Sequence, residues 1–196
     1  MTIKRLEGEQ TEQDPNLLPI ILDHINPGDT VIDCGAWIGG HTMAYLGKVG
    51  IHGCVFAFEP NFFAYECLTA NAPQAFTCNV ALGDKNQLVH FTTNEGWYDS
   101  GHVGGIAPVV QMRRLDDYQL APNFIKIDVE GCEYKVLVGA ARTIIKHRPK
   151  MVIEINPEAL KRQGSSPHHI FDWIQDNGYS WQTIGLIDEI YNIITT

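Results

Sequence analysis

The sequence has few basic residues, and this limits the partners that the chain can bind. It holds 14 lysines and arginines against 23 aspartates and glutamates, and its net charge is −9. A phosphate backbone is bound by a strongly basic surface. The short clusters Arg113-Arg114 and Lys146-His147-Arg148 do not make one, so we expect no nucleic-acid partner.

The sequence also lacks the signatures of metal-bound cysteines, membrane helices and secretion. Its five cysteines include no C-x-x-C pair, and most lie inside or beside expected strands and helices, as reduced buried thiols do. No apolar run reaches the ~20 residues that span a membrane, and neither end resembles a signal peptide. We expect a cytoplasmic protein that does not insert into membranes.

The length and the apolar content suit a single folded unit. The chain has 196 residues, 44% of them hydrophobic, which is enough for one domain with a sizeable core. A polar segment and a short apolar helix precede the turn Asn26-Pro27-Gly28-Asp29. We therefore predict an N-terminal arm and helix over residues 1–27 and one α/β domain over residues 28–196.

The central feature of that domain is the stretch from Val31 to Thr42. An apolar, β-branched run ends at Asp33, a turn containing Gly35 and Gly39 follows, and a helical pattern then begins. A buried strand, a glycine turn and a helix form the ligand-binding corner of a doubly wound sheet. Glycine allows a ligand to approach the backbone there, although tight packing of an ordinary turn would require the same residues.

The spacing of these glycines disfavours a dinucleotide. Trp37 occupies the place of the second glycine in the G-x-G-x-x-G pattern, and Asp33 would repel a pyrophosphate. A carboxylate there suits a cationic ligand, such as the ammonium group of an amino acid. The pattern D-x-G-x-x-x-G resembles the first motif of class I methyltransferases, which bind S-adenosylmethionine.

A second acid stands about 20 residues beyond the glycine turn. Glu59 follows the apolar run 54–58, so it lies at the carboxyl end of a second strand. A carboxylate at that position accepts hydrogen bonds from both hydroxyls of a ribose. The alternative is a solvated acid before Pro60, but the register of Glu59 with Asp33 and the turn favours a ribose site.

Apolar runs and helical patterns alternate to the end of the chain. Further strands are expected at residues 75–82, 123–129, 151–155, 180–184 and 190–194, and helices at 61–71, after Gly131 and from Ser165 or Ser166. We predict a doubly wound, mostly parallel seven-stranded α/β sheet that closes with an antiparallel C-terminal hairpin. A small β insertion around residues 88–112 interrupts the alternation.

Residues 94–105 of that insertion are rich in glycine and aromatic side chains. Long glycine-bearing loops in compact domains often cover an active site, and a surface hairpin with a long tip is the other interpretation. His102 lies in this segment and is a candidate catalytic base, although a histidine in a loop is commonly just solvated.

Acidic residues lie at the carboxyl end of the strand expected at 123–129. Asp128 and Glu130 are the best candidates for a base, because clustered acids at the carboxyl edge of a sheet can have a raised pKa. Glu130 is alternatively structural, accepting backbone N–H groups around Gly131. Glu133 fits the acid of a first helical turn better than a catalyst.

A metal-assisted site is a further alternative. Asp128, Glu154 and Asn156 end neighbouring strands, and their oxygens are ligands of the kind that Mg²⁺ prefers. The arrangement resembles the metal site of catechol-type methyltransferases. Because carboxylates at such an edge are common and the spacing is not specific, a divalent metal is not favoured.

Several blocks occur together in one order: 33–42, 58–61, 79–84, 115–118, 125–133 and 152–154. In this order they resemble the FkbM family of S-adenosylmethionine-dependent methyltransferases. The block Ile-Lys-Ile-Asp-Val-Glu-Gly is the most specific, and Cys132 after it stands where alanine is commoner. The resemblance covers roughly residues 28–160, and the region beyond carries no family motif that we can assign.

The resemblance implies S-adenosylmethionine as the cofactor and assigns roles by position. Asp33 and the two glycines would frame its methionine end, Thr42 would bind its carboxylate, and Glu59 would hold the ribose. Asn79 and Val80 would meet the adenine edge, with a turn residue as the alternative for Asn79. The cofactor-binding set is Asp33, Gly35, Ala36, Trp37, Gly39, Thr42, Glu59, Pro60, Asn61, Asn79, Val80 and Asp128, and the catalytic set is Asp128, Glu130 and His102.

The implied activity is O-methylation of a hydroxyl on a sugar, a glycan or a small secondary metabolite. Displacement at a reactive sulfonium needs mainly orientation and desolvation, and the hydroxyl must still lose its proton. An NAD-dependent oxidoreductase and a catalytically silent cofactor-binding subunit are the alternatives. The 94–106 loop or a second subunit of a homo-oligomer would complete the acceptor pocket.

Overall fold

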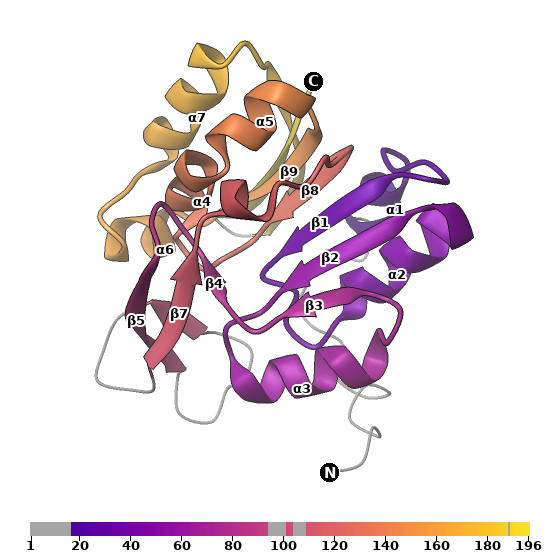
Figure 1. Cartoon of the computed structure of the whole chain (residues 1–196). Helices are drawn as coiled ribbons and strands as arrows, with labels where there is room; N and C mark the ends of the chain where they lie inside the picture. The colour runs from indigo at the N-terminus through magenta and orange to yellow at the C-terminus, as the bar shows by residue number, and fades with distance from the viewer. Residues whose placement is uncertain (1–16, 94–100, 104–108, 188) are drawn as a thin grey trace.

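The computed structural model describes residues 17–93, 101–103, 109–187 and 189–196 (Figure 1). Its main sheet has seven strands in the order β10-β11-β9-β8-β1-β2-β3. The strands are β1 (Thr30–Cys34), β2 (Cys54–Phe58), β3 (Phe76–Cys78), β8 (Phe124–Ile127), β9 (Lys150–Ile155), β10 (Trp181–Ile187) and β11 (Ile190–Thr195). β11 pairs antiparallel with both β9 and β10, and the other neighbouring strands of this sheet pair in parallel. The predicted doubly wound sheet with a C-terminal hairpin is confirmed.

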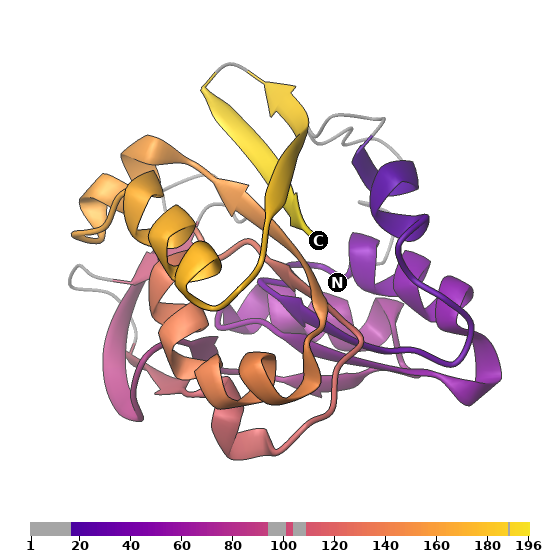
Figure 2. The same ribbon diagram turned by 90° about the horizontal axis from the view of Figure 1, so that it is seen from above.

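Helices cover both faces of this sheet, because each strand alternates between two apolar cores. On one face, α1 (Leu17–Leu22) and α2 (Gly40–Val49) pack Ile21 and Tyr45 against Val31 of β1. On the other face lie α4 (Glu133–Gly139), α5 (Ala141–His147) and α7 (Pro167–Asp176). Figure 2 shows α1 and α2 on the opposite side of the molecule from the orange and yellow helices.

The remaining helical elements are shorter or lie at the ends of the sheet. They are α3 (Phe62–Asn71), α6 (Pro157–Arg162), and the 3₁₀ turns η1 (Gly50–His52) and η2 (Leu115–Tyr118). The N-terminal helix α1 shares its core with β1. The proposed boundary after residue 27 stays a prediction.

The predicted insertion is a separate four-stranded sheet in the order β4-β7-β5-β6. Its strands are β4 (Ala81–Leu82), β5 (Gln87–Thr93), β6 (Gly101–Val103) and β7 (Val109–Arg113), and Ala81, Val89 and Met112 form its small core. The expected loop at 94–105 lies outside the described residues, apart from 101–103, which form β6.

Two predicted elements differ from the structure. The strand expected at 75–82 ends at Cys78, because the chain crosses to the second sheet, where Ala81 pairs with Met112 of β7. The long helix expected after Gly131 is two helices, α4 and α5. The Asp116 carboxylate accepts the N–H groups of Arg142 and Thr143 at 3.2 and 2.8 Å, and this gives α5 its own start.

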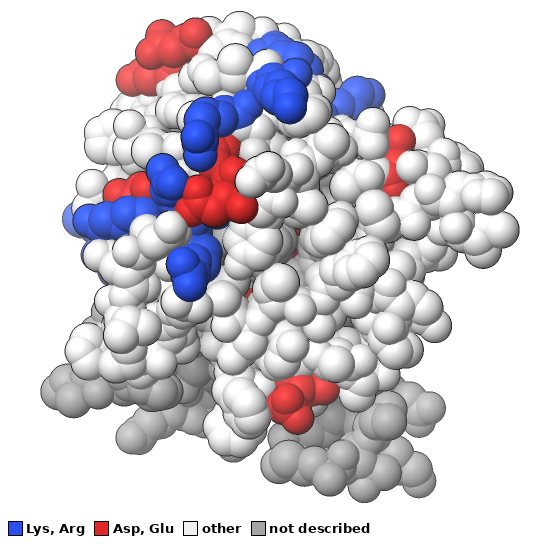
Figure 3. Space-filling model, in the orientation of Figure 1, with Lys and Arg blue, Asp and Glu red and all other residues white. Residues whose placement is uncertain are grey.

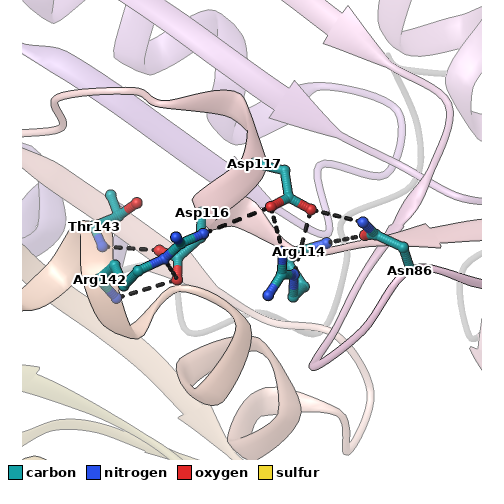
Figure 4. A network of polar contacts seen from close by, with 6 residues as sticks. All are labelled: Asn86, Arg114, Asp116, Asp117, Arg142 and Thr143. Atoms are coloured by element: carbon teal, nitrogen blue, oxygen red, sulfur yellow. Dashed lines mark hydrogen bonds and ion pairs between the residues drawn. The ribbon is translucent and has the colours of Figure 1, made fainter.

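A polar network on the surface joins η2 to the neighbouring elements (Figure 4). Asp117 accepts from Asn86 at 2.7 Å and from the Arg114 guanidinium at 2.6 Å, while Arg142 lies 3.2 Å from Asp116. These residues either lie in the Leu115–Tyr118 block or contact it. The network therefore ties the insertion to helix α5.

In the described part of the chain, no helix is both long enough and apolar enough to cross a membrane.

Candidate active site

One face of the central sheet changes from apolar to charged along β1, β8 and β9. On the side of α1 and α2, Val31 of β1 is followed two residues later by Asp33, and Phe124 of β8 by Lys126. The register pairs Asp33 directly with Lys126. On β9, Val152 is followed by Glu154 in the same way. Charged groups from several strands therefore gather at the carboxyl edge.

The turn between β1 and α2 packs directly on that edge. Gly35 has φ +80°, and a Cβ there would lie 1.7 Å from the backbone oxygen of Asp128. Gly39 has φ +93°, and its Cβ would meet Leu68 at 2.9 Å. The N–H groups of Gly35 and Ala36 both donate to the Phe58 carbonyl. Packing within the protein already requires both glycines, as the alternative for this turn allowed.

Trp37 lies at the tip of this turn in an unusual conformation. Its φ is +47°, which is rare for a bulky side chain. The Glu59 carboxylate accepts its backbone N–H at 2.8 Å and so holds the turn. The indole Nε1 is buried and has no hydrogen-bond partner among the described residues.

Glu59 is buried at the end of β2, with 6% of its surface exposed. Its second carboxyl oxygen accepts the N–H of Asn61 at 2.7 Å. Burial raises the pKa of Glu59 to about 7. The Asn79 amide donates to the carbonyls of Glu59 and Pro60 at 2.8 and 3.1 Å, so the exposed Asn79 braces the segment that follows β2.

Two residues of the expected cofactor set have structural partners of their own. The Asn61 side chain accepts the N–H groups of Phe63 and Ala64 and caps α3. Val80 packs against the core beneath the sheet. Neither observation assigns a ligand to these positions.

The side chain of Thr42 is engaged within the protein, so the predicted binding of a carboxylate at Thr42 rests on the backbone at the start of α2. The residue is completely buried, and its hydroxyl donates to Asp33 Oδ2 at 2.7 Å. The hydroxyl is therefore engaged beneath the turn and is not presented to a carboxylate. What the start of α2 offers is the backbone N–H groups of its first turn, which have no acceptor within the helix itself. Asp33 is itself fully buried, and its Oδ1 has no hydrogen-bond partner in the described structure.

Lys126 is the first of three residues of this site that the sequence analysis missed. Its ammonium lies 2.8 Å from Asp128 Oδ2, 3.9 Å from Asp33 Oδ1 and 3.4 Å from the Gly35 carbonyl. Burial alone would lower the pKa of Lys126, but the two carboxylates raise it above its ordinary value. The sequence does contain a signal for Lys126, because a lysine between Ile125 and Ile127 is unusual in a strand that is expected to be buried.

Asp128 and Glu154 form an unequal pair of acids. Burial would raise the pKa of Asp128, but Lys126 and a hydrogen bond with Glu154 hold it below its ordinary value. Burial raises the pKa of Glu154 far above its ordinary range, and the charges of Asp128, Glu130 and Glu133 add to this. Asp128 is therefore the carboxylate and Glu154 the carboxylic acid of the pair.

The turn after Asp128 is held by Glu133. Its carboxylate accepts the N–H groups of Val129 and Gly131 at 3.1 and 3.0 Å. This is the structural role that the sequence left open for Glu130, and the structure gives it to Glu133. Burial raises the pKa of Glu133 to about 7. Glu130 is half-buried, with φ +54°.

The helix α2 adds two groups that the sequence did not indicate, the half-buried His41 and the buried Tyr45. Burial, helped by the charge of Lys126, lowers the pKa of His41 to about 4, so this histidine is neutral at pH 7. Tyr45 is completely buried, and its hydroxyl has no hydrogen-bond partner among the described residues. Its ring lies 5.9 Å from that of His41.

The alternative metal site is not supported at Asn156. Its side chain accepts the N–H of Ala159 at 3.0 Å and caps α6, so Asn156 has a structural role. The described residues contain no cluster of three or more His, Cys, Asp or Glu side chains arranged to hold a metal. His102 lies on β6 opposite Thr92, and its side chain is outside the described part of the structure.

Residues 33–181 match the family model described as the methyltransferase FkbM domain. The chain belongs to the FkbM methyltransferase family. The match includes the glycine turn, Glu59, Lys126 and the acids at the ends of β8 and β9. The family resemblance of the sequence is thereby confirmed.

The FkbM-family chain is similar to a curated relative, the hexuronic acid methyltransferase AglP of Haloferax volcanii. The two are 26% identical over 153 residues, which is 72% of this chain and 60% of AglP. This chain therefore spans less than two thirds of that relative's length.

Solved structures share the fold. The FkbM methyltransferase of Methylobacillus flagellatus KT superposes with a TM-score of 0.66 at 19% identity, over 91% of this chain and 50% of that one. Aeropyrum pernix fibrillarin, solved with natively bound S-adenosyl-L-methionine, gives a TM-score of 0.54 at 14% identity over 88% and 67%. The architecture is that of class I methyltransferases.

Proposed function

We propose that this methyltransferase uses S-adenosylmethionine to methylate a hydroxyl of a sugar, a glycan or a small secondary metabolite. The observation that carries the proposal is the arrangement at one sheet edge. A glycine turn, the buried carboxyl of Glu59 and the ionised Asp128 lie at the ends of three neighbouring strands, β1, β2 and β8. This places groups suited to the cofactor beside a group suited to accept a proton.

The residues present fit the cofactor. Each oxygen of Glu59 accepts one backbone N–H and keeps a lone pair for a ribose hydroxyl. The N–H groups at the start of α2 suit a carboxylate, and the exposed Asn79 suits the adenine edge. The unpartnered Nε1 of Trp37 is a buried donor within the same turn. When bound, S-adenosylmethionine supplies a methyl group activated on sulfur.

Asp128 is the proposed base for the acceptor hydroxyl. It is ionised and its side chain is 21% exposed, so it is within reach of a substrate. Lys126 and Glu154 occupy positions beside it and fix its orientation. Proton removal by a positioned carboxylate contributes about 100-fold or more to such reactions. Glu130 and His102 stay as further proposed catalytic residues.

The charges favour a hydroxyl over a carboxylate as the acceptor. A carboxylate needs no base, and the ionised Asp128 would repel it. AglP is a hexuronic acid methyltransferase by name, and this likeness supports a carbohydrate as the acceptor here. The segment 94–108 contains two acids and no lysine or arginine, which adds to the preference for a neutral polyol.

Calorimetric titration tests the cofactor. We expect S-adenosylmethionine and S-adenosylhomocysteine to bind with micromolar dissociation constants and NAD not to bind. Glu59→Ala should weaken both adenosyl ligands by about 1.5–3 kcal/mol, the cost of losing a charged acceptor. Glu66→Ala, on the exposed part of α3, is the matched control. If the folded protein binds NAD and neither adenosyl ligand, the proposal is wrong.

A further inference from the structure

Lys126 is buried in the middle of the sheet, where a lysine is uncommon. It lies on the central strand β8 with 5% of its surface exposed, and its neighbours Ile125 and Ile127 point into the opposite core. A charge in such a place is costly unless it is paired and hydrogen-bonded. Its contacts therefore have to account for its presence.

Each contact of the Lys126 ammonium comes from a different functional part of the site. Asp33 ends β1, the Gly35 carbonyl belongs to the turn, and Asp128 follows β8. The ammonium has three donors, and the 2.8 and 3.4 Å contacts engage two of them. It thereby bridges the turn proposed to hold the cofactor and the carboxylate proposed to act as base.

Several other titratable groups surround Asp128, and none of them replaces the positive charge of Lys126. His41 and Tyr45 face it from α2, and Glu154 faces it from β9. Asp33, Glu133 and Glu130 lie nearby in β1 and in the turn after β8. Of these groups, the acids and the tyrosine carry no positive charge in either protonation state. His41 is neutral at pH 7 because burial lowers its pKa to about 4.

We propose that Lys126 is a positioning residue of the methyltransferase site: its ammonium holds Asp128 as an ionised, oriented carboxylate and ties it to the Gly35 turn. The proposal deepens the proposed function and rests on it for the roles of the turn and of Asp128. The ammonium does not touch the acceptor in this scheme. It links the turn that is proposed to hold the cofactor to the carboxylate that is proposed to act as base.

The first test is a carboxyl titration of the ligand-free protein by carbon NMR, which needs neither substrate nor cofactor. In the wild type, the pKa of Asp128 should lie below the ordinary value of an aspartate, because Lys126 stabilises the carboxylate. In Lys126→Met the pKa of Asp128 should rise well above its wild-type value, because a partly buried acid without its cation takes up a proton more readily. Lys150→Met removes an exposed lysine at the opposite end of β9 and should leave the titration unchanged. An unchanged Asp128 titration in Lys126→Met overturns the proposal.

The second test is calorimetry with S-adenosylhomocysteine. Lys126→Met should weaken binding about tenfold, because the Gly35 carbonyl loses its donor, whereas Lys150→Met should bind as the wild type does. Wild-type affinity in Lys126→Met would show that Lys126 only fills space. If the wild type itself does not bind, the proposed function fails, while the carboxyl titration still decides the effect of Lys126 on Asp128.

A variant that removes both charges guards against misfolding. Lys126→Met/Asp128→Asn leaves no unpaired charge at this contact and should fold where the single variant does not. It should still bind S-adenosylhomocysteine about tenfold more weakly than Asp128→Asn alone. Should neither Lys126→Met variant fold, nitrogen NMR of the lysine ammonium groups in the wild type decides. An exchange-protected signal that shifts with S-adenosylhomocysteine supports the proposal, and one that does not shift overturns it.

Discussion

The molecule contains two clusters of paired acids and bases that differ in their exposure. At the sheet edge, Lys126 lies 2.8 Å from Asp128, and only 7% of the lysine side chain is exposed. On the surface, Arg114 lies 2.6 Å from Asp117, with 40% and 31% of the two side chains exposed. The Arg142 side chain is 71% exposed and lies 3.2 Å from Asp116, whose side chain is 6% exposed. Figure 3 shows acidic and basic side chains next to each other on this surface. The two clusters therefore have similar distances between their charged atoms but differ strongly in solvent exposure.

The difference explains what each cluster can do. In the buried cluster, low dielectric makes each charge depend on its neighbours, so Asp128 and Glu154 hold different protonation states. In the surface cluster, water and salt screen the pairs, which serve mainly to start α5 and to hold η2. The first arrangement is suited to chemistry and the second to joining elements of the fold.

The largest effect is expected where the buried cluster is broken. Lys126→Met should lower the free energy of unfolding by about 3 kcal/mol, because it leaves the partly buried carboxylate of Asp128 without its cation. Arg142→Met should cost about 1 kcal/mol or less, because the arginine is exposed and Asp116 keeps the backbone N–H groups of residues 142 and 143 as partners. Urea unfolding of both variants measures the contrast. Equal losses of the free energy of unfolding in the two variants would contradict the prediction that the buried cluster contributes more to stability than the surface cluster.

Removing the proposed base should cost activity but little affinity. Asp128→Asn should reduce methyl transfer to a polyol acceptor by about 100-fold or more, because the hydroxyl loses its proton acceptor. Binding of S-adenosylhomocysteine should change less than about threefold. Asp117→Asn in the surface cluster should leave turnover unchanged. Wild-type turnover in Asp128→Asn would remove Asp128 from the catalytic set.

The buried acids predict that stability falls as pH rises. The folded-state pKa of Glu133 is about 7 against an ordinary value of 4.5, so the folded chain binds more protons between these values. Its stabilising effect is complete below pH 4.5 and is lost as pH rises through 7. Glu59 acts in the same direction. The contribution of Glu133 reaches at most about 3 kcal/mol.

Glu133→Gln checks this pH dependence by urea unfolding between pH 5 and pH 8. The variant keeps an acceptor for Val129 and Gly131 and cannot ionise, so its stability should fall less steeply than that of the wild type. Glu66→Gln on the exposed part of α3 should keep the wild-type slope. Identical slopes in Glu133→Gln and the wild type would contradict the prediction.

The smallest effect concerns salt. About 1 M sodium chloride should abolish the small loss of stability caused by Arg142→Met, because exposed charges are screened. The loss caused by Lys126→Met should persist, since its ammonium is buried. Repeating the urea unfolding at low and high salt measures both. A loss that disappears for Lys126→Met as well would show that water reaches this cluster.

Local patterns were sufficient for most of the fold. The periods of two and 3.6 residues placed the strands and most of the helices, and the carboxyl ends of parallel strands necessarily share an edge. Asp33, Glu59 and Asp128 were therefore found as acids of one site. The end of β3 at Cys78 and the separate start of α5 were not found, because β7 and Asp116 decide them from distant parts of the chain.

The sequence by itself determined the family, the succession of strands and helices along the chain and the acids at the sheet edge, because these follow from local periodicity and from a motif. Only the tertiary structure decided the partner of each acid. Lys126 and Gly35 are 91 residues apart in the chain and meet through sheet register. Burial then sets which acid keeps its proton, since desolvation depends on everything packed around a group. No pattern within one segment contains that information.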